Sequence, residues 1–274
     1  RKPILHQAQI GETVSIIYAP YYMNDNGRLY DAVLDQPAAD SMADTLDLDA
    51  FTGGPSKFKM DFIATLCPHC GWDLTGCRDS LVLACRNCSR AWKARGRALK
   101  ELKLAHLPAG ENAKPLYLPF WRIKADVAGL PLSSYADMVR AANLPRVPQP
   151  QWEKIDFRFW GPAFKVRPQF YLRLATSVTL SQPVDKLSPQ LPPAASAAHP
   201  VNLPLSEAVE TLKLNIASFL TPRERVAELL EQIDIQARKF LLVYLPFEER
   251  HHEYVHTGMN LAIQKNQLQL AHNL

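Results

Sequence analysis

Glycine is scarce in this sequence: the chain of 274 residues contains only 11, and none of the glycine-rich loops that bind phosphate is present. The Gly-x-Ser-x-Gly turn that carries a nucleophilic serine is also missing. No apolar run approaches the roughly 18 residues that a membrane-spanning helix needs, and no charged and then apolar signal segment opens the sequence. These absences argue against a nucleotide-dependent enzyme and a membrane-spanning protein. We therefore expect a protein that is not an enzyme.

The composition indicates a folded protein with a substantial core. Hydrophobic residues make up 47% of the chain, which is long enough for one large domain and a small module. The net charge of +4 is too small to indicate nucleic-acid binding by itself. The arrangement of particular residues is therefore more informative than the totals.

The cysteines form two pairs, with two residues inside each pair and fourteen between the pairs. These four residues are Cys67, Cys70, Cys85 and Cys88. Each pair places two thiolates on one tight turn, and two such turns face to face provide the tetrahedral set of four sulfurs that zinc prefers. The sequence predicts one structural Zn²⁺ per chain, with disulfides, free thiols or iron in the same cage as alternatives. The fifth cysteine, Cys77, is expected to be a free loop thiol, with a substitute ligand or a redox-sensing thiol as the alternatives.

The residues around the pairs support a metal site. Gly71 follows the first pair, where a positive φ lets backbone N–H groups turn toward the sulfurs, and Ser89 takes this place after the second pair. Residues 80–84 are expected to form a strand that leads into the second turn, and residues 91–94 one that leaves it.

On these features the chain resembles the zinc-ribbon superfamily over roughly residues 57–107. The first pair, in residues 67–71, is also similar to the rubredoxin-type turn. The second pair, in residues 85–89, departs from that pattern at the proline and glycine positions, which argues against redox iron. The resemblance implies a zinc-binding module and no particular activity.

Basic residues are concentrated in the same region. Residues 57–103 contain ten basic and four acidic residues, a net charge of +6. This surface could face phosphate or a protein partner, or its charges could simply offset the zinc–thiolate group and the acidic loop at 35–49. The candidate contact residues here are Arg86, Arg90, Lys93, Arg95 and Arg97.

A second set of candidate contacts lies in residues 152–173, where aromatic and basic residues are interleaved. Surfaces that stack bases on rings and hold phosphates with cations show this pattern. An ordinary strand and helix with an aromatic core face fit it equally, and we prefer that interpretation. The candidates are Arg158, Trp160, Lys165 and Arg167.

One segment occurs three times, as apolar-Tyr-apolar-Pro-aromatic, at 17–22, 116–121 and 243–248. Because proline lacks a backbone donor, these strands should run at a sheet edge or bend. With return strands at 28–34 and 253–263, the copies are interpreted as related hairpins of one sheet, with an aromatic binding groove as the alternative. The Tyr-Leu-Pro-Phe-Trp form of the second copy is also similar to segments of uncharacterised bacterial zinc-ribbon proteins, which implies no established activity.

Two copies of this segment flank the ribbon, so we expect an α+β fold in which a sheet of repeated hairpins packs against helices and the zinc ribbon is inserted. The predicted domains are residues 57–107 for the ribbon and a discontinuous α+β domain of residues 1–56 and 108–274. Residues 183–204 contain six prolines and are predicted to be a loop. The apolar spacing of residues 205–238 predicts a helical hairpin.

Shorter elements are predicted from local signals. Helices are expected at 135–143 and 169–178, and a terminal β-hairpin at 260–270. The second helix of the helical hairpin should start at residues 221–224, where Thr, Pro and Glu fit the cap, the first helical position and the capping carboxylate.

Residues 252–256 match His-Glu-x-x-His, which on a helix provides two zinc ligands and a general base. Alignment with the repeats instead places this stretch on a return strand, where His252 and His256 share a face and Glu253 points to the other. The downstream ligand patterns of metalloproteases are also missing. We interpret the match as coincidental.

We therefore expect a non-catalytic zinc-binding adaptor or assembly subunit that acts through protein–protein contacts. Its partner should be another protein or a larger complex, in the cytoplasm, where clustered thiols stay reduced. A nucleic-acid-binding zinc-ribbon protein is the alternative, and a His-Glu-x-x-His metallohydrolase is the third hypothesis. The sequence predicts neither the oligomeric state nor the identity of the partner.

Overall fold

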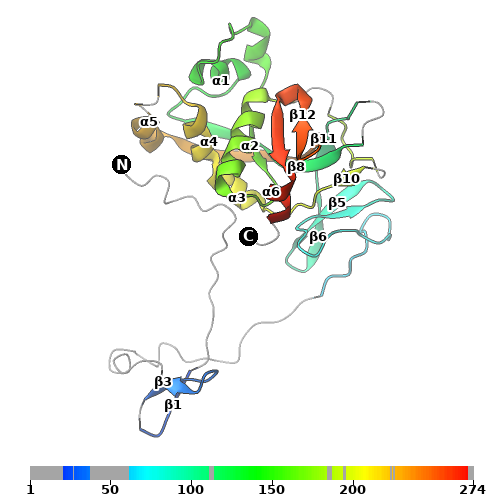
Figure 1. Cartoon of the computed structure of the whole chain (residues 1–274), viewed down its shortest axis with the longest axis vertical. Helices are drawn as coiled ribbons and strands as arrows, with labels where there is room; N and C mark the ends of the chain where they lie inside the picture. Colours follow the sequence, from blue (N-terminus) through cyan, green and yellow to red (C-terminus); the bar gives the residue numbers. More distant parts are fainter. Residues whose placement is uncertain are drawn as a thin grey trace. The chain divides into compact units, whose positions relative to one another are not determined.

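The computed structural model describes residues 21–26, 28–37, 62–110, 114–183, 187–193, 196–222, 224 and 226–270. Helices and mostly antiparallel sheets occur together, which confirms the predicted α+β class (Figure 1). The chain divides into a small unit, Glu12–Phe62, and a large unit that contains Ile63–Leu274. Among the described residues, no helix has both the length and the apolar character needed to cross a membrane.

The small unit contains a three-stranded antiparallel sheet of β1 (Tyr21–Met23), β2 (Leu29–Asp31) and β3 (Gln36–Pro37). The end of the first repeat falls in β1, and β2 lies within its predicted return strand; residues 17–20 are outside the described residues. The prediction that all three copies share one sheet is wrong, because β1 and β3 each pair with β2 in a sheet of their own.

The large unit is organised by two long antiparallel strands, β8 (Leu116–Ala128) and β11 (Asp234–Glu249). They contain the second and third repeats, which pair with each other: Tyr117 lies opposite Pro246, and Tyr244 lies opposite Pro119. The copies thus form one pair of strands that are far apart in the sequence.

Shorter strands flank this pair. β10 (Ala197–Ala198) and β9 (Phe159–Pro162) pair with the outer edge of β8. β7 (Leu104–His106) and β12 (Glu253–His256) pair with the outer edge of β11. β13 (Leu261–Gln264) then pairs with β12. Pro119 falls between the parts of β8 that pair with β10 and β9, and Pro246 between the parts of β11 that pair with β7 and β12. The missing backbone N–H of each proline therefore breaks no hydrogen bond to an outer strand.

The predicted helices at 135–143 and 169–178 are confirmed as α1 (Tyr135–Ala141) and α2 (Pro168–Ser181). Ser134 caps α1 and accepts from the backbone N–H of Asp137, whose carboxylate accepts from the N–H of Ser134 in return. Two 3₁₀ turns, Pro150–Lys154 and Thr257–Met259, complete the connections.

The helical hairpin at 205–238 needs correction. Its first half is divided into α3 (Leu205–Glu210) and α4 (Leu212–Phe219), and the described residues of its second half contain α5 (Val226–Gln232). Residues 234–238 belong to β11, because pairing with β8 overrides the local helical spacing. Pro222 lies in a bend rather than at the first position of a helix as predicted, and α5 begins at Val226.

The predicted terminal hairpin is also wrong, since residues 265–270 form α6 (Lys265–Leu270). Leu268 is buried there and packs with the sheet residues Leu261 and Ile263. Within the predicted loop at 183–204, β10 and a bridge from Ser188 to His106 tie parts of the chain to the sheet.

The central sheet separates two apolar cores, because successive side chains of β8 point to opposite faces. Tyr117, Trp121 and Ile123 join the core that includes α1 and α5, whereas Leu118 and Phe120 join the core formed mainly with α2. The module predicted as the ribbon, which keeps that name below, contributes Val82, Ala91 and Leu102 to the first core and so packs against the large unit's sheet.

Candidate metal centre

A small three-stranded sheet supports the cysteines: β4 (Leu83–Cys85), β5 (Arg90–Arg95) and β6 (Ala98–Leu102). The predicted strands at 80–84 and 91–94 match β4 and β5 in position. Cys85 ends β4, and Cys88 lies in the turn before β5; Cys67 and Cys70 lie in a turn closed by a bridge between Leu66 and Asp73.

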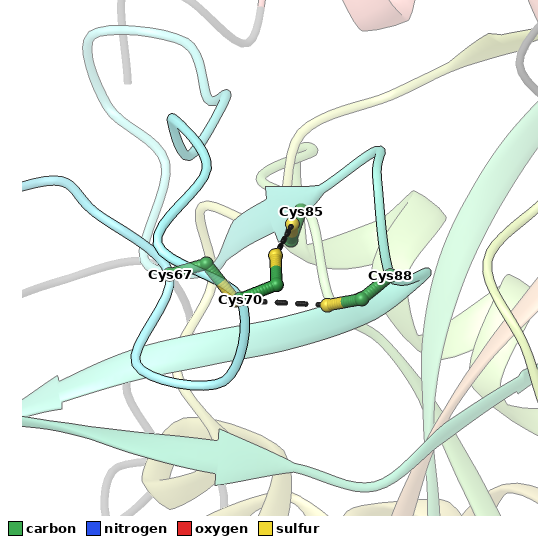
Figure 2. A group of neighbouring side chains, drawn as sticks. All are labelled: Cys67, Cys70, Cys85 and Cys88. Carbon is green, nitrogen blue, oxygen red and sulfur yellow. Dashed lines mark hydrogen bonds between the residues drawn. The ribbon is translucent and has the colours of Figure 1, made fainter.

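The four sulfurs converge on one point (Figure 2). All lie within 4.8 Å of one another, and Sγ–Sγ distances are 3.6 Å for Cys67–Cys88 and 3.5 Å for Cys70–Cys85. Metal–sulfur bonds of about 2.3 Å in a tetrahedron give sulfur–sulfur edges of about 3.8 Å. The cluster therefore has the size of a tetrahedral metal–thiolate cage and can bind a metal ion.

The backbone after each pair has the conformation expected of such a turn. Gly71 has φ +73° and Ser89 has φ +55°, so both turns place a left-handed residue after the second cysteine. The N–H of Gly71 donates to the carbonyl of Cys67 at 2.8 Å. The positive φ predicted at Gly71 is confirmed, and Ser89 adopts it as well despite its side chain.

The pKa values of Cys70 and Cys88 are shifted in opposite directions. A hydrogen bond from Asn87 lowers the pKa of Cys70 to about 6, whereas burial and the adjacent sulfur of Cys85 raise the pKa of Cys88 to about 12. Sulfurs this close repel one another as thiolates unless a cation lies among them. A cation among the four sulfurs would relieve this repulsion.

The four sulfurs can occupy all positions of a tetrahedral ion. Cys67 and Cys85 are buried beside Leu74 and Trp92, in a small core of the ribbon. Neither His69 nor Cys77 belongs to the cluster, whose ligands within the described part of the chain are the four cysteines alone. Four sulfurs leave no open position for a substrate, so the arrangement is suited to holding the fold together.

The candidate contact residues of the ribbon have different environments. Arg90 is held by both carboxylate oxygens of Glu101 at 2.9 and 3.0 Å, and Arg86 donates to the carbonyl of Pro192 at 3.5 Å. Lys93 and Arg95 have no ion pair among the described residues, whereas Arg97 has an interaction partner. The predicted cluster is therefore only partly free to meet a partner.

The second set of candidates does not form one surface. Trp160 is fully buried, with the guanidinium of Arg122 over its ring at 5.9 Å, so it is inaccessible to a base. Arg158 pairs with Asp156 at 2.6 Å. The backbone of Lys165 donates to Asn202 at 2.8 Å, and Arg167 precedes α2 and is exposed. Burial of the aromatic rings favours the core interpretation.

Sequence reasoning named Arg158 but missed the basic group to which it belongs. Four cations, Arg122, Lys124, Arg158 and Lys239, line one hollow of about 170 Å³. The sequence shows Arg122 and Lys124 at alternate positions, which is a signal for a basic strand face. Only the structure shows that Lys239 lies opposite Lys124 and completes the group.

The His-Glu-x-x-His stretch lies mainly on β12, a strand, as predicted. His256 packs on Phe247, and burial lowers its pKa. His252 is exposed. These side chains do not form a metal-ligand cluster within the described residues.

Comparison with known proteins identifies no relative: no family model, curated protein or solved structure matches the chain. The fold and the site together define an α+β protein with a four-cysteine cluster that can bind a metal ion.

Proposed function

We propose that the four cysteines bind one structural Zn²⁺ in a zinc-ribbon module, and that the protein is a non-catalytic adaptor or assembly subunit. The observation that carries this proposal is the closed cage of four sulfurs. Zinc prefers tetrahedral thiolate sites, and a site without an open position stabilises a fold rather than activating a substrate. Reduced thiols of this kind suit the cytoplasm, which we propose as the compartment.

Distances favour a metal over disulfides. A disulfide joins sulfurs at about 2.05 Å, whereas the close Sγ pairs are 3.5 and 3.6 Å apart. Of the two metals considered, zinc is supported by the second turn, which departs from the rubredoxin-type pattern at Arg86 and Ser89.

A structural ion would also hold the ribbon in place on the large sheet. The backbone N–H of Leu81 donates to the carbonyl of Val201 at 2.7 Å, and Asn202 donates to Asp79 at 2.7 Å. Ala91 and Leu102 are buried in the core of the sheet. The ion would therefore stabilise a module that packs against the central sheet.

Metal analysis of the purified full chain tests the zinc site. We expect one zinc per chain, lost in Cys85→Ser and kept in His252→Ala, since only the former removes a sulfur of the cage. Zinc that is lost in His252→Ala and kept in Cys85→Ser would contradict the proposal and support the metallohydrolase hypothesis.

A nucleic-acid-binding role is the second candidate, because Lys93 and Arg95 have no ion pair among the described residues. A titration with DNA and RNA at several salt concentrations separates the two roles. Steep loss of affinity with salt, abolished by charge reversal at Arg95 and Arg97, would overturn the adaptor role. Salt-insensitive or absent binding, together with co-purification of a stable protein partner, would support it.

A further inference from the structure

β6 of the ribbon and β11 of the central sheet separate at the junction between the two sheets. β6 and β7 are joined by Lys103 alone, and β7 runs parallel to β11, with Leu104 opposite Leu242. The N–H of Leu242 donates to the carbonyl of Lys103 at 3.3 Å. Before this point β6 pairs with β5 only, and β11 pairs with β8 only, among the described residues.

Each strand therefore has an edge without a strand neighbour in the described part of the chain. Unpaired strand edges present rows of N–H and C=O groups that another chain can pair with. Here the two edges belong to strands that run in the same direction and separate from a common point. This arrangement can receive an extended segment.

A groove of about 470 Å³ lies at this separation. Its apolar part is formed by Leu102, Leu205, Trp121 and Phe240. Trp121 is buried, and its ring meets that of Phe240 edge-on at 6.3 Å, whereas Phe240 is 49% exposed. The groove is large enough for one or two apolar side chains of a ligand.

The other side of the groove is strongly basic. Lys93 and Lys100 lie directly opposite each other on β5 and β6, and Arg95 follows on the same face. None of the three has an ion pair among the described residues. The nearby acidic residue Glu101 is already held by Arg90. Like charges directly opposite on neighbouring strands are destabilising, so an anionic ligand would relieve this repulsion.

We propose that this groove binds an extended acidic segment of a partner protein. The segment adds as a strand to the free edge of β6, places carboxylates against Lys93, Arg95 and Lys100, and packs an apolar side chain against Phe240. This inference rests on the proposed adaptor role and gives it a surface. Apolar walls around a single exposed ring fit a peptide with acidic side chains and one apolar side chain on the same strand face better than nucleic acid, which stacks successive bases on several rings.

The test uses the full, zinc-loaded chain and a displayed library of random peptides. We expect enriched peptides to carry their acidic residues and an apolar residue at every second position, because Lys93, Lys100 and Phe240 line the same groove and successive strand side chains point to opposite faces. A synthetic copy of the most enriched peptide, followed by fluorescence anisotropy, should lose at least about tenfold in affinity with Lys100→Glu and with Phe240→Ala. Methylation of alternate backbone nitrogens of the peptide should abolish binding in one of the two registers, because it removes the donors that pair with a strand.

Lys213→Glu is the matched control, because Lys213 is an exposed lysine on α4 outside the groove. It should leave the affinity unchanged. Lys93→Glu tests whether misfolding explains a loss of binding. The new carboxylate lies opposite Lys100 and can pair with it, which preserves the sheet. The same carboxylate still repels an acidic peptide.

No enrichment, enriched peptides without acidic residues, or equal affinity for all variants would overturn the inference. Binding of an oligo-dT probe that is lost in Lys100→Glu, without peptide enrichment, would overturn it in favour of nucleic acid. Zinc content and the set of co-purified proteins are measured on the same samples. If both are unchanged in Lys100→Glu, the groove proposal fails and the adaptor role stands.

Discussion

The ribbon and the central sheet of the large unit are stabilised in different ways. The ribbon's own core consists of Cys67, Leu74, Cys85 and Trp92 with a few partly buried neighbours. The central sheet instead lies between two extensive apolar cores that contain its large aromatic residues. A small apolar core rarely suffices for a stable fold, so the proposed metal ion would cross-link the ribbon where the sheet relies on burial.

Removal of the metal should have the largest effect and should act on the ribbon first. Structural zinc contributes on the order of 10 kcal/mol to the folding of small modules. With chelator, or in Cys85→Ser, we expect hydrogen exchange of β4–β6 to become fast while the β8–β11 pair stays protected. Equal loss of protection in both regions would show that the sheet depends on the metal as much as the ribbon does.

Truncation of a central aromatic residue should instead destabilise the central sheet, whether or not the metal is bound. Phe120 is fully buried and packs against Phe164 and Phe247 in the α2 core. Phe120→Ala should lower the free energy of unfolding by about 3–5 kcal/mol, with or without metal. The control is Phe240→Ala, which removes a half-exposed ring and should cost much less in urea denaturation. An equal cost for the two would contradict the described packing.

A smaller effect is expected where the sheet meets α2. A Cβ added at Gly161 would lie 2.7 Å from the hydroxyl oxygen of Tyr171, whose ring is fully buried and cannot move aside. Gly161→Ala should therefore destabilise by about 1–3 kcal/mol through overpacking. Gly110→Ala, where a Cβ meets nothing within 4 Å, is the matched control. Urea midpoints that shift equally would disprove the steric reason.

The smallest effect concerns the cap of α1. Burial alone would raise the pKa of Asp137, but the hydrogen bonds that its carboxylate accepts from Ser134 and Ser133 outweigh it and lower the pKa. This stabilisation is present above the unfolded pKa of about 4 and is lost as the pH falls through the lower folded value. Asp137→Asn should cost about 1 kcal/mol at neutral pH and less in acid.

Urea denaturation from neutral to acidic pH measures this dependence. Glu210→Gln, at the exposed end of α3, is the control and should leave the acid dependence unchanged. A cost for Asp137→Asn that is independent of pH would contradict the role of the charged carboxylate.

The cysteine cluster could be predicted from sequence because its geometry is local. Each pair of thiols lies on one turn, and β4 and β5 bring the second turn against the first within a short stretch of chain. The helices α1 and α2 were predictable for the same reason, since caps and apolar spacing are local signals.

Other features depend on contacts that the sequence pattern does not contain. The strand at 234–238 exists because β8 provides a partner for it, and the helix at 265–270 forms where an alternating pattern predicted a hairpin. The basic groove combines residues of β5 and β6 with Phe240, which is distant in the chain. Pairings of this kind are set by tertiary structure rather than by local propensity.

The register of the two paired repeats has a consequence for symmetry. Leu118 lies opposite Leu245, and the Tyr–Pro pairs on either side of it are reciprocal, so a local two-fold axis passes through this leucine pair. Two-fold axes of this type also generate isologous dimers, in which one segment meets an identical copy of itself. The centre of the sheet thus has the geometry of a homodimer interface within a single polypeptide, because each of the two strands pairs with a similar copy of itself.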